Sequence, residues 1–131
     1  MLVVLLLCFL FCSVFISPAM AYRAPLVIEA TGKHTASVLI LHGLGDSGHG
    51  WGSLFQGMKS LLPHVKWILP HAPSMPVTLN GGHRMPAWYD IYALNDKSRE
   101  DEEGVLKSSA YGSAFQLPFL SRRPTLILFF F

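Results

Sequence analysis

The sequence predicts an α/β protein, from the order of its apolar segments and from a glycine-rich turn between them. Residues 26–30 and 37–42 have the composition of strands, and the second run lacks polar alternation, as in a strand buried on both faces. Four glycines fall within residues 43–50, and apolar residues at helical spacing follow over residues 51–62. A further strand is expected at residues 65–69. The order strand, turn, helix, strand is that of a βαβ unit.

Composition limits the class of protein. The chain has 131 residues, of which 51% are hydrophobic and 14% charged, and its length allows one small domain. The net charge is only +2 and the chain has no long basic run, so it lacks the charge pattern of a nucleic-acid-binding protein. Both cysteines, Cys8 and Cys12, lie in the first 21 residues, so neither a disulfide framework nor a cysteine zinc site is expected. We expect no metal and no cofactor.

The first 21 residues have the pattern of a secretory leader. An apolar run from Leu2 to Ile16 precedes Pro18 and the triplet Ala19-Met20-Ala21. Residues 1–21 are therefore predicted to be a signal peptide or signal anchor, which places the chain in the secretory pathway or outside the cell. No Lys or Arg precedes the apolar run, so a start near Tyr22 and a cytoplasmic chain remain the alternative.

The second half of the chain gives weaker signals. Residues 70–86 carry four prolines and two glycines and are expected to lack regular structure. Ser98 with Asp101 resembles a capping box, so a helix is expected to begin there and to run to about Ala110. Residues 111–131 are interpreted as an apolar tail unrelated to the preceding domain, and the sheet without further strands would have a bare edge.

One alternative function follows from the glycine turn alone. Residues 43–48 satisfy G-x-G-x-x-G between a predicted strand and a predicted helix, the context of a dinucleotide-binding site. Such a site also needs an acidic residue about 20 positions further on, to bind the ribose. No Asp or Glu occurs between Asp46 and Asp90. A dinucleotide-binding βαβ module is therefore the weakest of the functions considered.

A longer set of motifs is far more specific than this glycine pattern. These motifs are residues 38–51, Pro70-His71-Ala72-Pro73, residues 76–80, residues 85–90 and the acidic segment 99–104. In this order they resemble the acyl-protein thioesterase / phospholipase-carboxylesterase family of α/β-hydrolases, over about residues 33–110. The resemblance implies an incomplete α/β-hydrolase fold: residues 22–110 would form the N-terminal part of a mostly parallel sheet with flanking helices.

The resemblance also implies an activity and a site. Members are serine hydrolases that cleave acyl thioesters of palmitoyl-proteins or carboxylic esters, with an oxyanion hole partly built by the loop after the first core strand. By resemblance the Leu44 N–H is the donor, and His42, Gly43, Gly45 and Asp46 complete the oxyanion loop. His42 is expected to hold the loop in place rather than to act as a base. The residues expected to line an acyl channel are Met75, Val77, Leu79, Met85 and Trp88.

The catalytic triad of this family is absent from the 131 residues. No G-x-S-x-G pentapeptide occurs, and no Asp, Glu or His follows Ala110. We therefore expect no esterase activity from this chain alone. Acylated proteins or lipid esters are the expected substrates of a completed site, and no nucleic-acid partner is expected. The alternative is a non-catalytic secreted or membrane-associated fragment that binds a partner or a lipid through its apolar ends.

Overall fold

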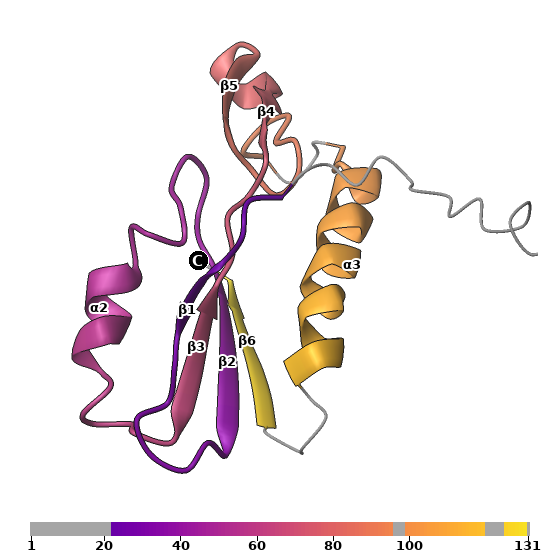
Figure 1. Ribbon diagram of the computed structural model, residues 1–131. Helices are drawn as coiled ribbons and strands as arrows, with labels where there is room; N and C mark the ends of the chain where they lie inside the picture. The colour runs from indigo at the N-terminus through magenta and orange to yellow at the C-terminus, as the bar shows by residue number, and fades with distance from the viewer. Residues whose placement is uncertain (1–21, 96–98, 120–124, 131) are drawn as a thin grey trace, which may run out of the picture.

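A mostly parallel four-stranded sheet forms the centre of the computed structural model, which describes residues 22–95, 99–119 and 125–130. The strands lie in the order β1-β3-β2-β6 (Figure 1). β2 is parallel to both β3 and β6, whereas β1 is antiparallel to β3. The strands are β1 (Leu26–Ile28), β2 (Ala36–Leu41), β3 (Val65–Leu69) and β6 (Thr125–Phe130).

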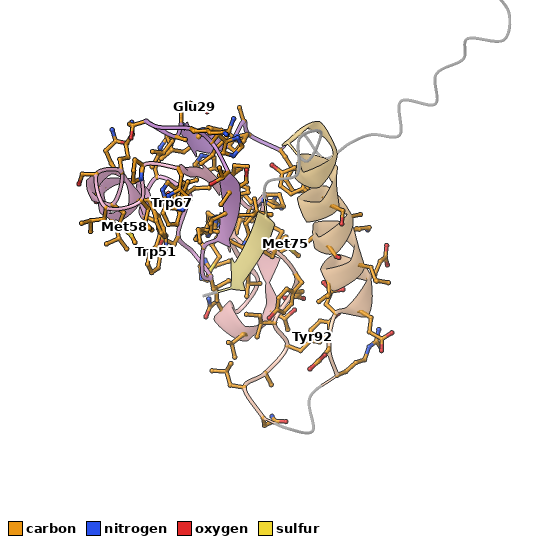
Figure 2. All side chains as sticks on the ribbon, turned by 90° about the horizontal axis from the view of Figure 1, so that it is seen from below. Glu29, Trp51, Met58, Trp67, Met75 and Tyr92 are labelled. Atoms are coloured by element: carbon orange, nitrogen blue, oxygen red, sulfur yellow. The ribbon has the colours of Figure 1, made fainter. Side chains whose placement is uncertain are left out.

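Side chains of β2 and β3 alternate between the two faces of the sheet, because successive residues of a strand point in opposite directions. Val38 and Ile40 belong to one apolar cluster, which includes Phe55 of α2 (Gly52–Gly57). Trp51, Met58 and Trp67 pack in the same cluster (Figure 2). Leu39, Leu41 and Ile68 form a second cluster, with Trp88 packed against it.

The two helices cover opposite faces of this sheet (Figure 1). α2 lies on the face of Val38, and α3 (Glu102–Phe119) on the face of Leu39, where the Leu39 side chain approaches Gly112. A sheet with helices on both sides is the layer arrangement expected of an α/β protein. The fold class predicted from the sequence is confirmed.

The segment from Pro70 to Pro86 differs from its prediction. It contains a β-hairpin of β4 (Ser74–Val77) and β5 (His83–Pro86), joined by a short 3-10 helix (Thr78–Asn80). Register pairs Ser74 with Pro86 and Val77 with His83. In a two-stranded ribbon each strand has a free outer edge, where a proline leaves no ladder hydrogen bond unmade. The prolines therefore do not exclude strands here.

The acidic helix also differs from its prediction. α3 begins at Glu102 and continues to Phe119, beyond the end expected near Ala110. Asp101 caps it, since its Oδ1 accepts the Gly104 N–H at 3.0 Å. Ser98 lies outside the described residues. Gly112 stands two positions after Ala110, but the helix continues through it, so this glycine does not act as a C-terminal cap.

The expected bare edge of β2 is occupied. β6 pairs with β2 from Ala36 opposite Thr125 to Leu41 opposite Phe130. The apolar composition of residues 125–130, interpreted as a free tail, suits a strand beside a buried neighbour equally well. The leader lies outside the described residues, and the division into leader, domain and unrelated tail stays a prediction. Of the helices described, none has the length and hydropathy to cross a bilayer.

Candidate functional site

A loop of residues 42–51, here called the glycine loop, leaves the carboxyl end of β2. Gly45 has a φ of +77°, a conformation that residues with a Cβ rarely adopt. Its N–H donates to the Pro86 carbonyl oxygen at 2.8 Å, which ties the loop to the end of β5. The Asp46 N–H donates to the Gly43 carbonyl at 3.2 Å and closes a tight turn. The chain therefore reverses direction at the edge of the sheet where ligands of α/β proteins bind.

Gly48 is the point where the glycine loop packs most tightly. A Cβ at this position would overlap the carbonyl oxygen of Leu69 and stand 2.8 Å from that of Pro70. The Gly48 N–H donates to Nδ1 of His71 at 3.2 Å. Only glycine fits so close to the end of β3, so Gly48 fixes the part of the loop that lies beside this strand.

Trp88 holds the end of the glycine loop that follows β2. Its Nε1–H donates to the carbonyl oxygen of His42 at 2.8 Å, and the two rings lie 5.2 Å apart. The Trp88 carbonyl in turn accepts the hydroxyl of Ser108, which is 8% exposed on α3. Tyr111, one helical turn further on, stacks near the Trp88 ring at 6.2 Å. β2, the glycine loop and α3 are thus joined through one tryptophan.

Leu44 is an exposed residue of the loop between these anchors. Its side chain is 40% exposed, and no hydrogen bond in the described part of the chain uses its N–H. A backbone N–H held in this way can donate to an oxygen on which negative charge develops. Beside it is a cavity of about 230 Å³, lined by His42, Gly43, Leu44, Ala87, Trp88, Tyr89 and Ile91.

The predicted acyl-channel residues are not all brought to this cavity. Trp88 lines it, whereas Val77 is fully buried and Leu79 lies on the 3-10 helix, 36% exposed. Met75 and Met85 face each other in register across the hairpin. The residues that join Trp88 at the cavity are Ala87, Tyr89 and Ile91, from the segment that follows the hairpin.

A carboxylate pair positions the hairpin relative to α3. Asp90 accepts the Thr78 N–H at 2.7 Å on Oδ1 and the Thr78 hydroxyl at 2.6 Å on Oδ2. The Asp90 N–H donates to Oδ2 of Asp101 at 2.8 Å. Two backbone N–H donors, those of Asp90 and Gly104, hold the pKa of the Asp101 carboxyl below its usual value. The segment that carries Trp88 is therefore fixed at both ends.

Two histidines support the glycine loop, and one was missed from the sequence. His42 is buried, and its Nε2 accepts the Ala72 N–H at 3.0 Å, which joins the base of the glycine loop to the segment after β3. His71 holds Gly48 from the end of β3. A signal for it existed: His42 directly follows β2, His71 comes two residues after the end of β3, and the ends of parallel strands meet at one edge of a sheet. Pro86 and Ser108 carried no such signal.

The described residues do not contain a metal centre. Within them, no three His, Cys, Asp or Glu side chains are placed to hold a metal ion. His49 and His71 lie with ring centroids 4.6 Å apart, and burial together with nearby positive groups lowers the pKa of His71. The candidate site therefore consists of the Leu44 N–H, the cavity beside it and the two histidines that hold the glycine loop.

Comparison with known structures defines the class of protein first. The chain is similar to the crystal structure of Zea mays acyl-protein thioesterase 2, with a TM-score of 0.75 and 37% identity, over 84% of this chain and 46% of that one. The fold is therefore part of an α/β-hydrolase. The phospholipase/carboxylesterase family model matches residues 23–115, and the chain belongs to this family.

Curated relatives agree with this assignment. Acyl-protein thioesterase 1 of Neurospora crassa is 48% identical over 100 residues, which cover 71% of this chain and 41% of that protein. Acyl-protein thioesterase 1 of Schizosaccharomyces pombe is 55% identical over 83 residues, which cover 63% and 37% respectively. The chain thus spans about two fifths of the length of these relatives.

Proposed function

We propose that this chain supplies the oxyanion-hole half of a serine hydrolase site for acyl thioesters on proteins or for carboxylic esters. The observation that carries the proposal is the Leu44 N–H, which makes no hydrogen bond in the described part of the chain and lies beside the cavity that includes Trp88. Relatives named acyl-protein thioesterase support the thioester as the substrate class. An acylated protein is the partner that this function requires.

The proposed chemistry assigns one step to this chain. When a serine attacks the acyl carbon, the carbonyl π electrons move onto oxygen, and the resulting oxyanion needs donors already in place. Leu44 supplies one N–H, and the glycines beside it let the backbone approach the substrate. The 131 residues contain no G-x-S-x-G pentapeptide, and no Asp, Glu or His follows Ala110. This sequence therefore does not supply the serine, the base or the acidic residue of the triad.

A chimera tests the donor. Residues 22–110 would replace the matching part of Zea mays acyl-protein thioesterase 2, and thioester hydrolysis would be followed with a palmitoylated peptide. Leu44→Pro removes the N–H and is expected to lower kcat by about 10²–10³-fold. Leu44→Ala keeps the N–H and is the matched control, expected to retain activity within a few-fold. Equal activity of the two variants would reject the oxyanion role.

A second experiment tests the chain by itself. We expect no labelling by a fluorophosphonate probe and no hydrolysis of a p-nitrophenyl ester, because loss of the triad leaves only what binding and a complete oxyanion hole provide. Labelling at any serine would contradict this expectation. The alternative of a fragment that binds a partner or a lipid through its apolar ends stays a prediction, and vesicle flotation of the unlabelled chain is its measurement.

We also propose that the first 21 residues are a cleaved leader. The support is the small-residue triplet before Tyr22 and the ring of Tyr22 itself, which stacks on Tyr111 with centroids 3.6 Å apart. Cleavage after Ala21 would leave the contact between Tyr22 and Tyr111 intact. N-terminal sequencing of the protein made in a secreting cell is expected to begin at Tyr22. A product that begins at Met1 and stays in the cytoplasm would favour the alternative.

A further inference from the structure

Two buried histidines follow β2 and β3, and each accepts a hydrogen bond from the segment that follows the other strand. Nε2 of His42 accepts the N–H of Ala72, which follows β3, at 3.0 Å. Nδ1 of His71 accepts the N–H of Gly48, in the glycine loop that follows β2, at 3.2 Å. His42 and His71 are 1% and 5% exposed. We call these two imidazoles the histidine clamp.

The acceptor atoms fix the protonation of both rings. A ring nitrogen that accepts a backbone N–H carries no proton itself, so each ring is neutral and holds its proton on the other nitrogen. In His42 that nitrogen is Nδ1, which lies 2.8 Å from the Gly43 carbonyl oxygen. In His71 it is Nε2, which is buried and has no hydrogen-bond partner among the described residues. The His71 ring is thus held by one hydrogen bond only.

Protonation would reverse the contact between His71 and Gly48. An added proton on Nδ1 turns the acceptor into a donor that faces another donor, so the hydrogen bond is lost. Gly48 has no room to move toward β3, because even a Cβ built on its backbone would overlap the carbonyl oxygens of Leu69 and Pro70. The backbone must therefore move away from β3, and it carries the rest of the glycine loop with it.

The groups around His71 make this event specific to acidic conditions. His49, whose ring centroid is 4.6 Å away, and His42 face it from the glycine loop, and Arg23 acts on it from the segment before β1. Burial first, and then the interactions with His49, Arg23 and His42, lower the pKa of His71 from its usual value. The neutral, loop-holding form is the form present at neutral pH.

We propose that the histidine clamp is an acid-sensitive support of the glycine loop, in which protonation of His71 releases Gly48 and displaces the Leu44 N–H. His71 is in this sense a positioning residue, since it acts through Gly48. The consequence for hydrolysis rests on the proposed function above, whereas release of the loop does not. A failed Leu44 test would therefore leave the clamp standing, and a failed clamp would leave the donor role standing.

The experiment is an NMR titration of the ¹⁵N-labelled full chain from pH 8 to pH 5. We expect the His71 ring nitrogens and the Gly48 amide to change with one common midpoint below the usual histidine pKa. Hydrogen-exchange protection of Gly48 and Gly45 is expected to fall about tenfold through that midpoint, as one hydrogen bond is lost. The Ile68 amide in β3 is the internal reference and should keep its protection. Different midpoints for His71 and Gly48, or constant Gly48 protection, would overturn the proposal.

Variants separate protonation from simple damage. His71→Asn places an amide oxygen near the position of Nδ1 but cannot be protonated, so Gly48 protection should become independent of pH. His83→Asn removes an exposed histidine of β5 and should keep the wild-type transition. His49→Gln removes an interaction that lowers the pKa of His71 and should move the midpoint to higher pH, which also covers the case in which His71→Asn does not fold. A transition that persists in His71→Asn, or a midpoint unmoved by His49→Gln, counts against the clamp.

Discussion

The indole N–H of Trp88 donates to the carbonyl oxygen of His42 over 2.8 Å and across 46 residues of chain. The same tryptophan lines the cavity beside Leu44, and its own carbonyl is held by Ser108 of α3. Trp88 therefore connects the glycine loop, the wall of the cavity and helix α3.

Trp88→Phe is expected to loosen the glycine loop. It removes the Nε1–H while keeping an aromatic ring, and one hydrogen bond of this kind contributes about 0.5–1.5 kcal/mol. Gly45 protection in hydrogen exchange should fall by roughly tenfold. Trp67→Phe is the matched control, because in the described part of the chain the buried Trp67 Nε1 makes no hydrogen bond. Equal loss of Gly45 protection in both variants would show that ring volume, not the hydrogen bond, matters.

Gly48→Ala is expected to destabilise the fold. The new methyl group would meet backbone oxygens of Leu69 and Pro70, which have no rotamer to change, so the loop must shift at a cost of about 1–3 kcal/mol. Gly57→Ala is the control: no atom lies within 4 Å of its Cβ position, and alanine favours the helix by about 0.5–1 kcal/mol. Urea unfolding should give a lower midpoint for the first variant and an equal or higher one for the second. The reverse order would refute the packing argument.

Stability should depend on pH through Asp101. Its pKa is lowered in the folded chain by the N–H groups of Asp90 and Gly104, so the ionised carboxylate stabilises the fold above the unfolded pKa. That stabilisation is lost as the pH falls from the unfolded pKa through the folded one. Thermal unfolding between pH 5 and about pH 2 should show a smaller fall for Asp101→Asn than for the parent chain. Parallel curves for the two proteins would contradict the assignment.

Tyr111 should ionise only at high pH in the folded chain. Burial, and then the adjacent Tyr22, raise the pKa of Tyr111 to about 12. The folded state thus prefers the neutral phenol, and the stability it contributes is lost as the pH rises from about 10 through 12. Ultraviolet titration should show a transition near pH 12. The transition should disappear in Tyr111→Phe and persist in Tyr92→Phe; its survival in Tyr111→Phe would reject the assignment.

Local sequence patterns were sufficient to predict the central strands and the glycine loop. The strand at residues 65–69 was predicted with the bounds that β3 has, because a short run of bulky apolar residues ends at a proline on its carboxyl side. His42, expected to hold the loop, bonds the Ala72 N–H through its side chain, and its role in a site stays a prediction. The resemblance of residues 38–51 to a known loop supplied the donor assignment, which composition alone does not contain.

The parts that were missed depend on contacts between distant residues. Pro76 and Pro86 indicated irregular structure, but a ribbon with two free edges tolerates both. The pairing of Leu41 with Phe130 depends on a crossover through α3, which no local window encodes. The support that His71 gives to Gly48 joins residues 23 positions apart, and it becomes visible only when both strand ends are placed at one edge.

The sequence distances of these ties determine when the donor can exist during synthesis. Gly48 and His42 are held by residues 23 and 30 positions downstream, and the Trp88 tie reaches back 46. Closing such segments costs chain entropy before any contact repays it, so the loop gains its geometry only after β3 and the hairpin have docked. A nascent chain stopped before His71 would contain every atom of the Leu44 donor and none of these three ties.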